Sequence, residues 1–440
     1  MQTATTSSDP LTSAQRLRSI FSGSVGNLVE WYDWYVYAAF SLYFAHSFFP
    51  AGDRTSQLLN TSAVFAVGFL MRPLGGWLLG RYADRHGRRR ALMLSVLLMC
   101  TGSLIITFTP GHAAIGVAAP VLLVFARLLQ GLSVGGEYGT SATYLSEMAG
   151  QRHRGFWSSF QYVTLVMGQL LALAVLIVLQ QMFLSEEQLR AWGWRIPFAI
   201  GALAAVTALW LRRNMRETTA FDRSERDPAT AQTQQGTLRV LLRHPRELLT
   251  VAGLTMGGTL AFYTYTTYMQ KFLVNSAGLD SRAAALLNAS TLSVYMLMQP
   301  AVGAVSDRIG RRPVLVAFGI AGLLLTVPIM TTLQHVQTAA QAFWLILAAL
   351  SIVSCYTAIN AVVKAELFPV EVRALGVGLP YAVTVAVFGG TAEYVALWFK
   401  RAGIESGFYW YVTACIGVSL LVYLRMPETQ RTSRIDRDAA

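Results

Sequence analysis

The chain alternates long apolar runs with short polar segments. Each run holds about 20 residues or more, the length that an α-helix needs to cross the hydrocarbon core of a bilayer. Backbone in lipid must satisfy its own hydrogen bonds, and the ~10-residue alternating pattern of an outer-membrane barrel is absent, so helices are favoured. We therefore expect an all-α integral membrane protein with twelve transmembrane helices, at residues 20–46, 57–82, 91–109, 116–148, 156–184, 193–212, 248–273, 284–305, 314–333, 341–366, 375–399 and 407–425.

One long polar break separates the sixth run from the seventh. It is rich in Arg, Asp, Gln and Thr, which is typical of a solvated connection between two folded parts. The predicted organisation is an N-terminal cytoplasmic tail, a six-helix bundle, a cytoplasmic linker, a second six-helix bundle and a C-terminal cytoplasmic tail, at residues 1–19, 20–212, 213–247, 248–425 and 426–440.

The composition agrees with a membrane protein. Hydrophobic residues make up 54% of the chain and charged residues 13%, whereas average soluble chains carry about 25% charged residues. Arg residues gather in the tails, the linker and the loops on one side, so both termini should be cytoplasmic. The net charge of +12 suits anionic lipid headgroups and needs no nucleic acid. The His residues lie at segment ends or in loops, and the Cys residues lack ligand spacing, so we expect no metal site.

One polar sequence occurs twice, half a chain apart. GRYADRHGRRR at 80–90 and GAVSDRIGRRP at 303–313 match at six of eleven positions. A second echo pairs YLSEMAGQRHRG after the fourth span with VKAELFPVEVRALG after the tenth. Gly allows close helix approach, and Asp can pair with Arg at a tight turn. We expect these positions to control conformational gating: Gly80, Asp84, Arg85, Gly87, Arg88, Gly303, Asp307, Arg308, Gly310, Arg311, Glu147, Arg154, Glu366 and Arg373.

These motifs carry a resemblance to a known family. GRYADRHGRRR resembles the signature loop of the major facilitator superfamily, and RLLQGLSVGGEYG (127–139) resembles its fourth-helix motif. GNLVEWYDWYVYAAFSLYFAHSFFP (26–50) and GWRIPF (193–198) are similar to its metabolite–proton symporter branch. The resemblance implies the major facilitator fold, with two pseudo-symmetric six-helix bundles and a substrate site between them near the midplane.

Acidic residues inside the spans are candidates for proton coupling. A charged side chain near the bilayer centre costs ~2.5–3.5 kcal/mol on insertion scales, so each one is a functional candidate. Burial in a low-dielectric cavity disfavours the charged form of a carboxyl group, whereas a nearby Arg favours it. An acid that exchanges Arg for a proton during the cycle would couple transport to protons. The candidates are Asp33, Glu30, Glu137 and Glu393.

Cations inside the spans are candidates for anion binding. Arg grips a carboxylate with two parallel hydrogen bonds and stays protonated when buried. A dicarboxylate needs two positive ends, so we expect two cationic anchors. Three alternatives stay open: an ion pair of Arg72 with Glu30 or Asp33, an interfacial Lys271, and an aromatic belt formed by the Tyr-rich run. The candidate substrate-binding residues are Arg72, Arg127, Asn27, Tyr263, Tyr268, Lys271, Lys364, Tyr356 and Gln161.

The resemblance implies a secondary active symporter of the bacterial inner membrane. It would import a dicarboxylate, first of all 2-oxoglutarate, with protons, by alternating access. Citrate, shikimate, a C4-dicarboxylate or a zwitterion such as betaine or proline are the alternatives in the same branch. No phosphate-binding loop is present, so the proton gradient is the expected energy source, without cofactor. No nucleophile–base constellation suggests an enzyme, and we expect a monomer in the lipid bilayer.

Overall fold

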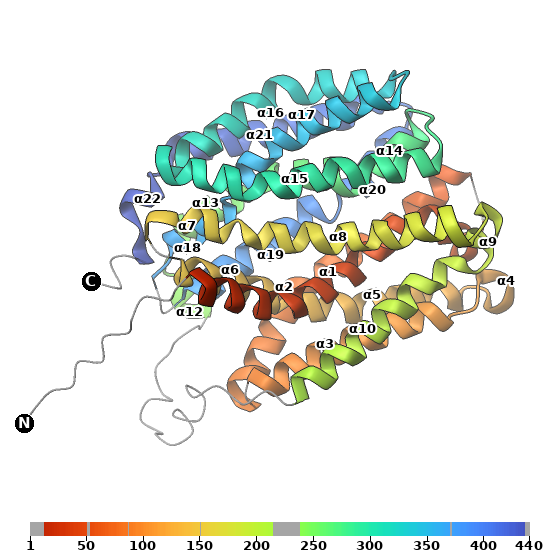
Figure 1. The fold of residues 1–440 in the computed structure, drawn as a ribbon, viewed down its shortest axis with the longest axis horizontal. Coiled ribbons are helices and arrows are strands. Elements are labelled where there is room, and N and C mark those ends of the chain that lie inside the picture. The colour runs from red at the N-terminus through yellow and green to blue at the C-terminus, as the bar shows by residue number, and fades with distance from the viewer. Residues whose placement is uncertain are drawn as a thin grey trace, which may run out of the picture.

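The computed structural model describes residues 13–50, 53–86, 88–149, 151–213, 238–369 and 372–435. In these ranges the regular structure is helical and contains no strand. The long helices run side by side, with α22 at one end of the molecule and α4 and α9 at the other (Figure 1). We call these the α22 end and the α9 end.

The helices before residue 214 form the first half of the molecule. Short helices α4 (His112–Ile115) and α9 (Glu186–Ala191) lie in its connections, with 3₁₀ turns at Gln151–His153 and Gly193–Arg195. Its long segments are α1 (Ser13–Phe48), α2 (Arg54–His86), α3 (Arg88–Phe108), α5 (Ala118–Gly135) with α6 (Glu137–Met148), α7 (Arg154–Ser158) with α8 (Phe160–Val178), and α10 (Ile196–Arg213).

The helices after residue 237 form the second half. Short helices α12 (Leu238–Leu241) and α22 (Thr429–Thr432) stand before and after its long segments. These are α13 (Pro245–Tyr263) with α14 (Met269–Asn275), α15 (Ser281–Ile309), α16 (Arg311–Gln334), α17 (Ala339–Thr357) with α18 (Asn360–Leu367), α19 (Arg373–Thr384) with α20 (Ala392–Arg401), and α21 (Ser406–Arg425).

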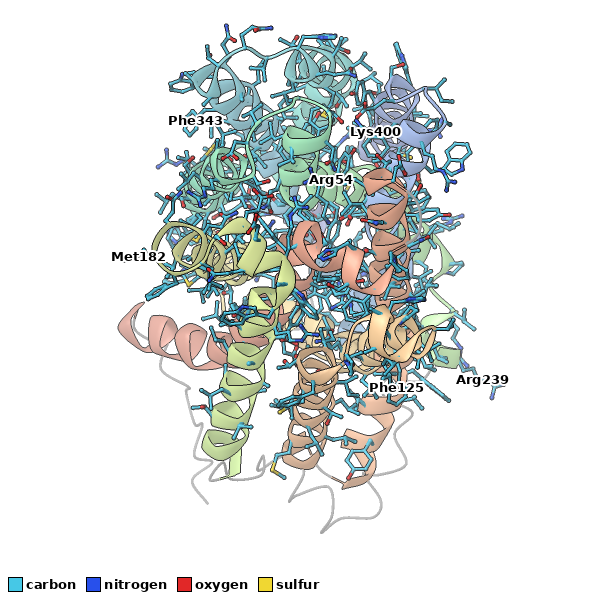
Figure 2. The ribbon with its side chains drawn as sticks, turned by 90° about the vertical axis from the view of Figure 1, so that its right-hand side faces the viewer. Arg54, Phe125, Met182, Arg239, Phe343 and Lys400 are labelled. Carbon is cyan, nitrogen blue, oxygen red and sulfur yellow. The ribbon has the colours of Figure 1, made fainter. Side chains whose placement is uncertain are left out.

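The two halves meet along several helices. In Figure 1, α3 and α10 lie on one side of the molecule and α16 and α17 on the other. Between them α8 packs against α15, α6 against α19, and α2 against α20. Apolar side chains on the outer surface, such as Phe125 and Met182, are 49% and 73% exposed and project outward, as Figure 2 shows. Such a surface suits contact with lipid.

The structure agrees with twelve spans. Seven described helical segments are long and apolar enough to cross a membrane, and Met93–Phe108 and Gly193–Thr207 are shorter apolar helices. The remaining three are α1, the α13–α14 segment and α15, which carry more polar side chains. Several spans are interrupted helices, which the apolar pattern alone did not indicate.

Three of these interruptions are π-helical turns, η2 (Leu179–Phe183), η4 (Thr264–Tyr268) and η5 (Val385–Gly389). A π-turn changes the local hydrogen-bonding register and often marks a functional site. The Thr266 carbonyl of η4 accepts hydrogen bonds from the side chains of Gln169 at 3.1 Å and Asn288 at 3.4 Å. Gln169 belongs to the first half, so this altered backbone connects the two halves.

Two glycines bring α2 and α5 into backbone contact. A Cβ atom at Gly131 would lie 2.1 Å from the Gly68 carbonyl oxygen, and one at Gly135 would lie 2.1 Å from the Arg72 carbonyl oxygen. Only glycine permits this approach, as at other small-residue contacts between membrane helices. The contact places Arg72 of α2 close to Arg127 of α5.

Candidate functional site

Arg72 and Arg127 both rest on aromatic rings at the centre of the first half. Their Cζ atoms lie 4.2 and 4.0 Å from the centroid of the Trp34 ring. Arg72 also lies 4.0 Å from the Phe69 ring, and Arg127 lies 4.5 Å from the Tyr37 ring. Cation–π attraction grows when the pair is desolvated, and both guanidinium groups are buried. The rings hold two like charges in one region without consuming their hydrogen-bond donors.

Each guanidinium keeps one edge available. The Nε and Nη2 atoms of Arg72 and of Arg127 have no hydrogen-bond partner among the described residues. This edge is one of those that grip a carboxylate with two parallel hydrogen bonds. Buried donors without partners are costly, so the site is suited to receive acceptors from outside the chain. The ion pair of Arg72 with Glu30 or Asp33, an alternative in the sequence, is not formed.

Asp33 contacts Arg127 only through an intermediate side chain. Its Oδ2 atom accepts hydrogen bonds from Ser103 Oγ at 2.5 Å and Gln130 Nε2 at 2.7 Å. The Oε1 atom of Gln130 accepts from Arg127 Nη1 at 2.7 Å. Asp33 Oδ1 is buried without a hydrogen-bond partner among the described residues. The carboxyl group therefore has one open oxygen and a polar connection to the cation.

Glu30 lies one turn earlier on α1, in a different polar cluster. Its carboxylate accepts from Ser95 and Ser133, each with an O–O distance of 3.2 Å. Both hydroxyl groups also interact with each other at 3.0 Å. The two acids that sequence placed on one face of α1 thus have separate surroundings, and Asp33 is the one connected to Arg127.

Lys364 lies between the two halves. Its Nζ atom is 3.1 Å from the hydroxyl of Tyr138 on α6 and 3.7 Å from the centroid of the Tyr381 ring. The Tyr138 and Tyr381 rings stack with centroids 3.9 Å apart, and Asn360 accepts a hydrogen bond from Tyr138 at 3.2 Å. The structure records no carboxylate for this buried ammonium among the described residues. A buried cation without a counter-charge can also attract an anion.

Lys271 has a different environment. Its Nζ atom donates to Glu393 Oε2 at 2.6 Å, and both side chains are buried. Lys271 was expected to bind substrate, or to reach the membrane surface, and Glu393 was expected to carry a proton. In this conformation each neutralises the other, and the pair connects α14 to α20.

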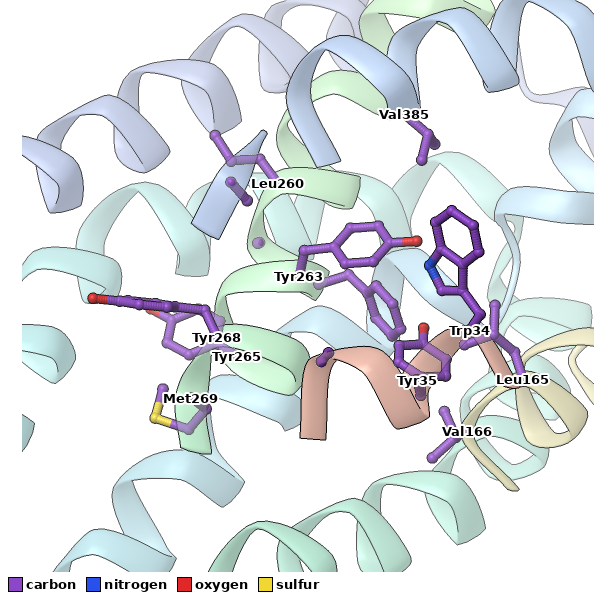
Figure 3. Packing of buried hydrophobic residues seen from close by; sticks show 14 of the residues in the cluster. Trp34, Tyr35, Leu165, Val166, Leu260, Tyr263, Tyr265, Tyr268, Met269 and Val385 are labelled. Carbon is purple, nitrogen blue, oxygen red and sulfur yellow. The ribbon is translucent and has the colours of Figure 1, made fainter. Parts of the chain in front are cut away.

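The two candidate tyrosines of the Tyr-rich run, one before the π-turn and one at its end, point in different directions. Figure 3 shows the Tyr263 hydroxyl directed toward Trp34, whereas Tyr268 points the opposite way. Tyr263 also packs edge-on against Phe69 of the first half, with centroids 5.2 Å apart, and Tyr268 packs against Phe272 and Phe408. Tyr263 therefore adjoins the arginine site and Tyr268 does not.

Two other candidate ligands, Tyr356 and Gln161, are buried. Tyr356 packs against Phe318 within the second half, with ring centroids 5.6 Å apart. Gln161 is buried on α8. The side chains of Asn27 and Glu137 lie outside the described residues.

Several predicted gating residues of the second copy form contacts between the two halves at the α22 end. Asp307 accepts hydrogen bonds from the backbone N–H groups of Gly155 at 2.7 Å and Phe156 at 2.9 Å, in the other half. It also forms an ion pair with Arg311 at 2.8 Å. Gly303 permits the contact, because a Cβ atom there would lie 2.5 Å from the Gly155 carbonyl oxygen.

Glu366 joins Arg154 of the first half, at 3.7 Å, to Arg311, at 3.8 Å. Arg373 donates a hydrogen bond to the Phe368 carbonyl at 3.1 Å. Arg308 is exposed, and Gly310 ends α15 with φ of +99°, a conformation that favours glycine. The remaining predicted gating residues lie outside the described residues or have side chains that are not described: Gly80, Asp84, Arg85, Gly87, Arg88 and Glu147.

Sequence reasoning missed several residues of the site. Gln130 follows Arg127 by three positions in an apolar span, and that spacing could have indicated it. Ser103, Tyr138 and Trp34 gave no signal, because serine and aromatic residues are ordinary in membrane helices.

Comparison with known proteins identifies the family. Residues 23–379 match the family model described as Major Facilitator Superfamily. The chain is 53% identical to the alpha-ketoglutarate permease of Escherichia coli over 437 residues, which covers 99% of this chain and all of the relative. It is 34% identical to the citrate-proton symporter of Salmonella typhi, with 83% of each chain covered.

A solved structure supports the same fold. The proton:xylose symporter XylE superposes with a TM-score of 0.73 at 18% sequence identity, covering 98% of this chain and 99% of that one. The proline/betaine transporter of Salmonella typhimurium is 30% identical over 94% of this chain and 83% of its own length. The relatives of this chain named above are transporters and not enzymes. The chain belongs to the Major Facilitator Superfamily.

Proposed function

We propose that this protein is a proton-coupled symporter that imports 2-oxoglutarate across the bacterial inner membrane by alternating access. The observation that carries the proposal is the pair of available edges on Arg72 and Arg127. Two guanidinium groups in one buried region fit a small dianion, because each can bind one carboxylate with two hydrogen bonds. The 53% identity to an alpha-ketoglutarate permease supports this substrate over other dicarboxylates.

In this proposal the α22 end is cytoplasmic, together with both termini. The contacts of Asp307 and Glu366 across the halves then close the cytoplasmic side, and substrate enters from the α9 end. Rocking of one half against the other breaks those contacts and opens the cytoplasmic side. The transporter acts as a monomer, without a cofactor.

Entry of a dianion against the membrane potential requires co-transported protons. Each unit charge moved through 100 mV is worth ~2.3 kcal/mol, so an inside-negative potential opposes entry of a dianion. Two protons per substrate make entry electroneutral, and a third lets the potential assist. Asp33 is the first candidate to carry one of them, because it is connected to Arg127 through Gln130.

A zwitterion such as betaine is the second candidate substrate, favoured by the aromatic rings around the site. A quaternary ammonium group binds in an aromatic cage. Here the Trp34 and Phe69 rings are already covered by the protein's own guanidinium groups. The site therefore attracts anions more strongly than a neutral zwitterion.

The test is uptake by proteoliposomes that contain the purified protein, with an inward proton gradient and labelled 2-oxoglutarate, citrate, malate, shikimate and betaine. We expect 2-oxoglutarate to accumulate and the other compounds to enter more slowly. Arg72→Ala should abolish uptake while insertion persists. Arg190→Ala, at an exposed Arg that pairs with Glu186, is the matched control. Betaine uptake that persists in Arg72→Ala would contradict the proposal.

A further inference from the structure

We propose that Gln130 is the positioning residue that transmits protonation of Asp33 to the anion-binding edge of Arg127. The inference rests on the proposed function and adds the connection between proton and substrate. It starts from an absence within the described helices: Asp33 and Arg127 form no direct ion pair there. The polar path between them passes through the Gln130 amide. Its Oε1 atom is 2.7 Å from Arg127 Nη1, and its Nε2 atom is 2.7 Å from Asp33 Oδ2.

The amide of Gln130 is held in one orientation by its partners. Its oxygen accepts from Arg127, and its nitrogen donates to Asp33 and to Ser103 Oγ at 3.0 Å. An amide turned the other way would present N–H groups to a cation and oxygen to a carboxylate, which both partners disfavour. Gly102 leaves the space that the side chain occupies, since a Cβ atom there would lie 2.7 Å from Gln130 Cγ.

The surroundings of Asp33 contain few other charges. On α10, Gly201 faces its open oxygen: a Cβ atom there would lie 2.3 Å from Oδ1. The charged or titratable groups nearby are Tyr32 and Glu30 on α1, Cys100 on α3 and Arg127 on α5. Of these, Arg127 is the cation that the amide contacts directly, so it is the group that responds to the charge of Asp33.

Protonation of Asp33 changes what Gln130 offers to Arg127. The proton binds the carboxylate at Oδ1, the oxygen without a hydrogen-bond partner among the described residues, and removes its negative charge. The amide nitrogen then faces a neutral acceptor, and the positive charge of Arg127 is no longer balanced along the path. A substrate carboxylate supplies the missing negative charge at the Nε–Nη2 edge. Because linkage is reciprocal, bound substrate also favours the protonated acid, and both are released together.

The test compares the pH dependence of KM in the wild type and in Gln130→Leu. In the wild type we expect KM for 2-oxoglutarate to rise as Asp33 loses its proton, by a factor of about 10, which is within the usual range of coupling between two sites. In Gln130→Leu the ratio of KM at high and low pH should fall to about 1, while exchange of internal for external substrate continues.

Two variants make the result specific. Gln299→Leu is the matched control, because Gln299 is a buried amide on α15 that contacts Tyr295 and Thr357, and it should keep the wild-type ratio. Asp33→Asn combined with Gln130→Leu should behave as Asp33→Asn alone, since coupled residues are not additive. If Gln130→Leu does not insert, Gln130→Met, of closer length, replaces it.

The outcomes separate the two proposals. A wild-type pH ratio in Gln130→Leu or Gln130→Met overturns the role of Gln130 and leaves the proposed function intact. Absence of 2-oxoglutarate uptake by the wild type overturns the proposed function itself.

A different set of contacts supports a second inference. We infer that residues 426–435, which follow α21, fasten the closed α22 end. Glu428 accepts from the backbone N–H groups of Arg311 at 2.8 Å and Arg312 at 3.0 Å, at the start of α16. Thr429 donates to Glu366 at 2.6 Å, and Gln430 donates to the Asp307 carbonyl at 2.9 Å.

The segment also reaches the other half. Ser433 accepts from Arg154 Nη1 at 3.3 Å, so the segment contacts both partners of the Arg154–Glu366 pair. Thr429 and Ser433 are buried although they follow the last span. When the halves separate at the α22 end, Arg154 moves away from Glu366 and the segment must lose contacts. It therefore biases the transporter toward the state in which this end is closed.

Spin labels can measure this bias. Cys residues introduced at Arg152 and Arg308, exposed at the α22 end in opposite halves, report its opening after Cys100, Cys355 and Cys415 are replaced by Ser. Thr429→Val combined with Ser433→Ala should increase the fraction of long distances several-fold. Thr432→Val, at an exposed neighbour, should leave the distances unchanged. An unchanged distribution in the Thr429–Ser433 variant overturns the inference.

Discussion

At the scale of single residues, the site separates cations that are available from cations that are already paired. Arg72 and Arg127 rest on rings and keep an edge without a hydrogen-bond partner among the described residues, whereas Lys271 is bound to Glu393. All three looked alike in the sequence, as charges within apolar runs. Their partners come from helices far away in the chain, so burial could be predicted and pairing could not.

Replacing Arg127 by Lys tests whether the guanidinium shape matters as well as its charge. Lysine carries a point charge and cannot form two parallel hydrogen bonds with one carboxylate. We expect KM for 2-oxoglutarate to rise roughly 10- to 100-fold in Arg127→Lys, which is the loss of one or two good hydrogen bonds to a charged group. Initial uptake rates measure this, with Arg190→Lys as control. Equal KM values would mean that charge alone suffices.

Asp33→Asn tests the acid. Asparagine keeps the size of the side chain but cannot take up or release a proton, so accumulation driven by a pH gradient should be lost. Exchange of internal for external substrate needs no net proton movement and should survive, because Asn is uncharged, as the protonated acid is. Gradient-driven accumulation that survives in Asp33→Asn would remove this acid from the coupling mechanism.

At the scale of helices, close contact between α2 and α5 creates the arginine site. The glycines of the repeated motif indicated that some helices approach closely, but not that α2 and α5 do. The structure shows Gly131 and Gly135 against carbonyl groups of α2. The π-turn at Thr264–Tyr268 was not predictable, because the same residues are compatible with a regular helix. It sends Tyr263 and Tyr268 to different surroundings.

Gly131→Ala should separate α2 from α5. The added Cβ atom would lie 2.1 Å from the Gly68 carbonyl oxygen, so the helices must move apart. Overpacking of this kind costs ~1–3 kcal/mol, and it would also displace Arg72 from Arg127. We expect a lower melting temperature in detergent and a strong loss of uptake. Gly417→Ala, whose Cβ atom would meet Leu323 at an ordinary 3.4 Å, should change neither property.

At the scale of the whole molecule, the sequence predicted the twelve spans and the duplicated motif, because both follow from patterns within the chain. The gating role of the repeated charges stays a prediction, and their partners could not be predicted from the sequence. In the folded protein Glu366 joins Arg154 of the first half and Arg311 of the second. Contacts between halves depend on the conformational state, which no local pattern encodes.

If the contacts between the halves control access, two aspartates that both bind backbone N–H groups should differ in their effect on uptake. Asp307 binds those of Gly155 and Phe156 in the other half, whereas Asp280 binds those of Arg282 and Ala283 at the start of its own helix. Asp307→Ala should weaken closure of the α22 end and reduce the fraction of transporters that can bind external substrate. The apparent KM rises by the inverse of that fraction.

We expect about a tenfold higher external KM in Asp307→Ala, which corresponds to about a tenfold fall in the fraction of transporters closed at the α22 end. Asp280→Ala should lose helix-cap stability of ~0.5–2 kcal/mol and leave KM unchanged. Uptake kinetics and melting temperature, measured on both variants, separate gating from stability. The same KM in both variants would show that the contacts of Asp307 hold the fold together and do not control access, because only a contact between the halves can change which side of the membrane the site faces.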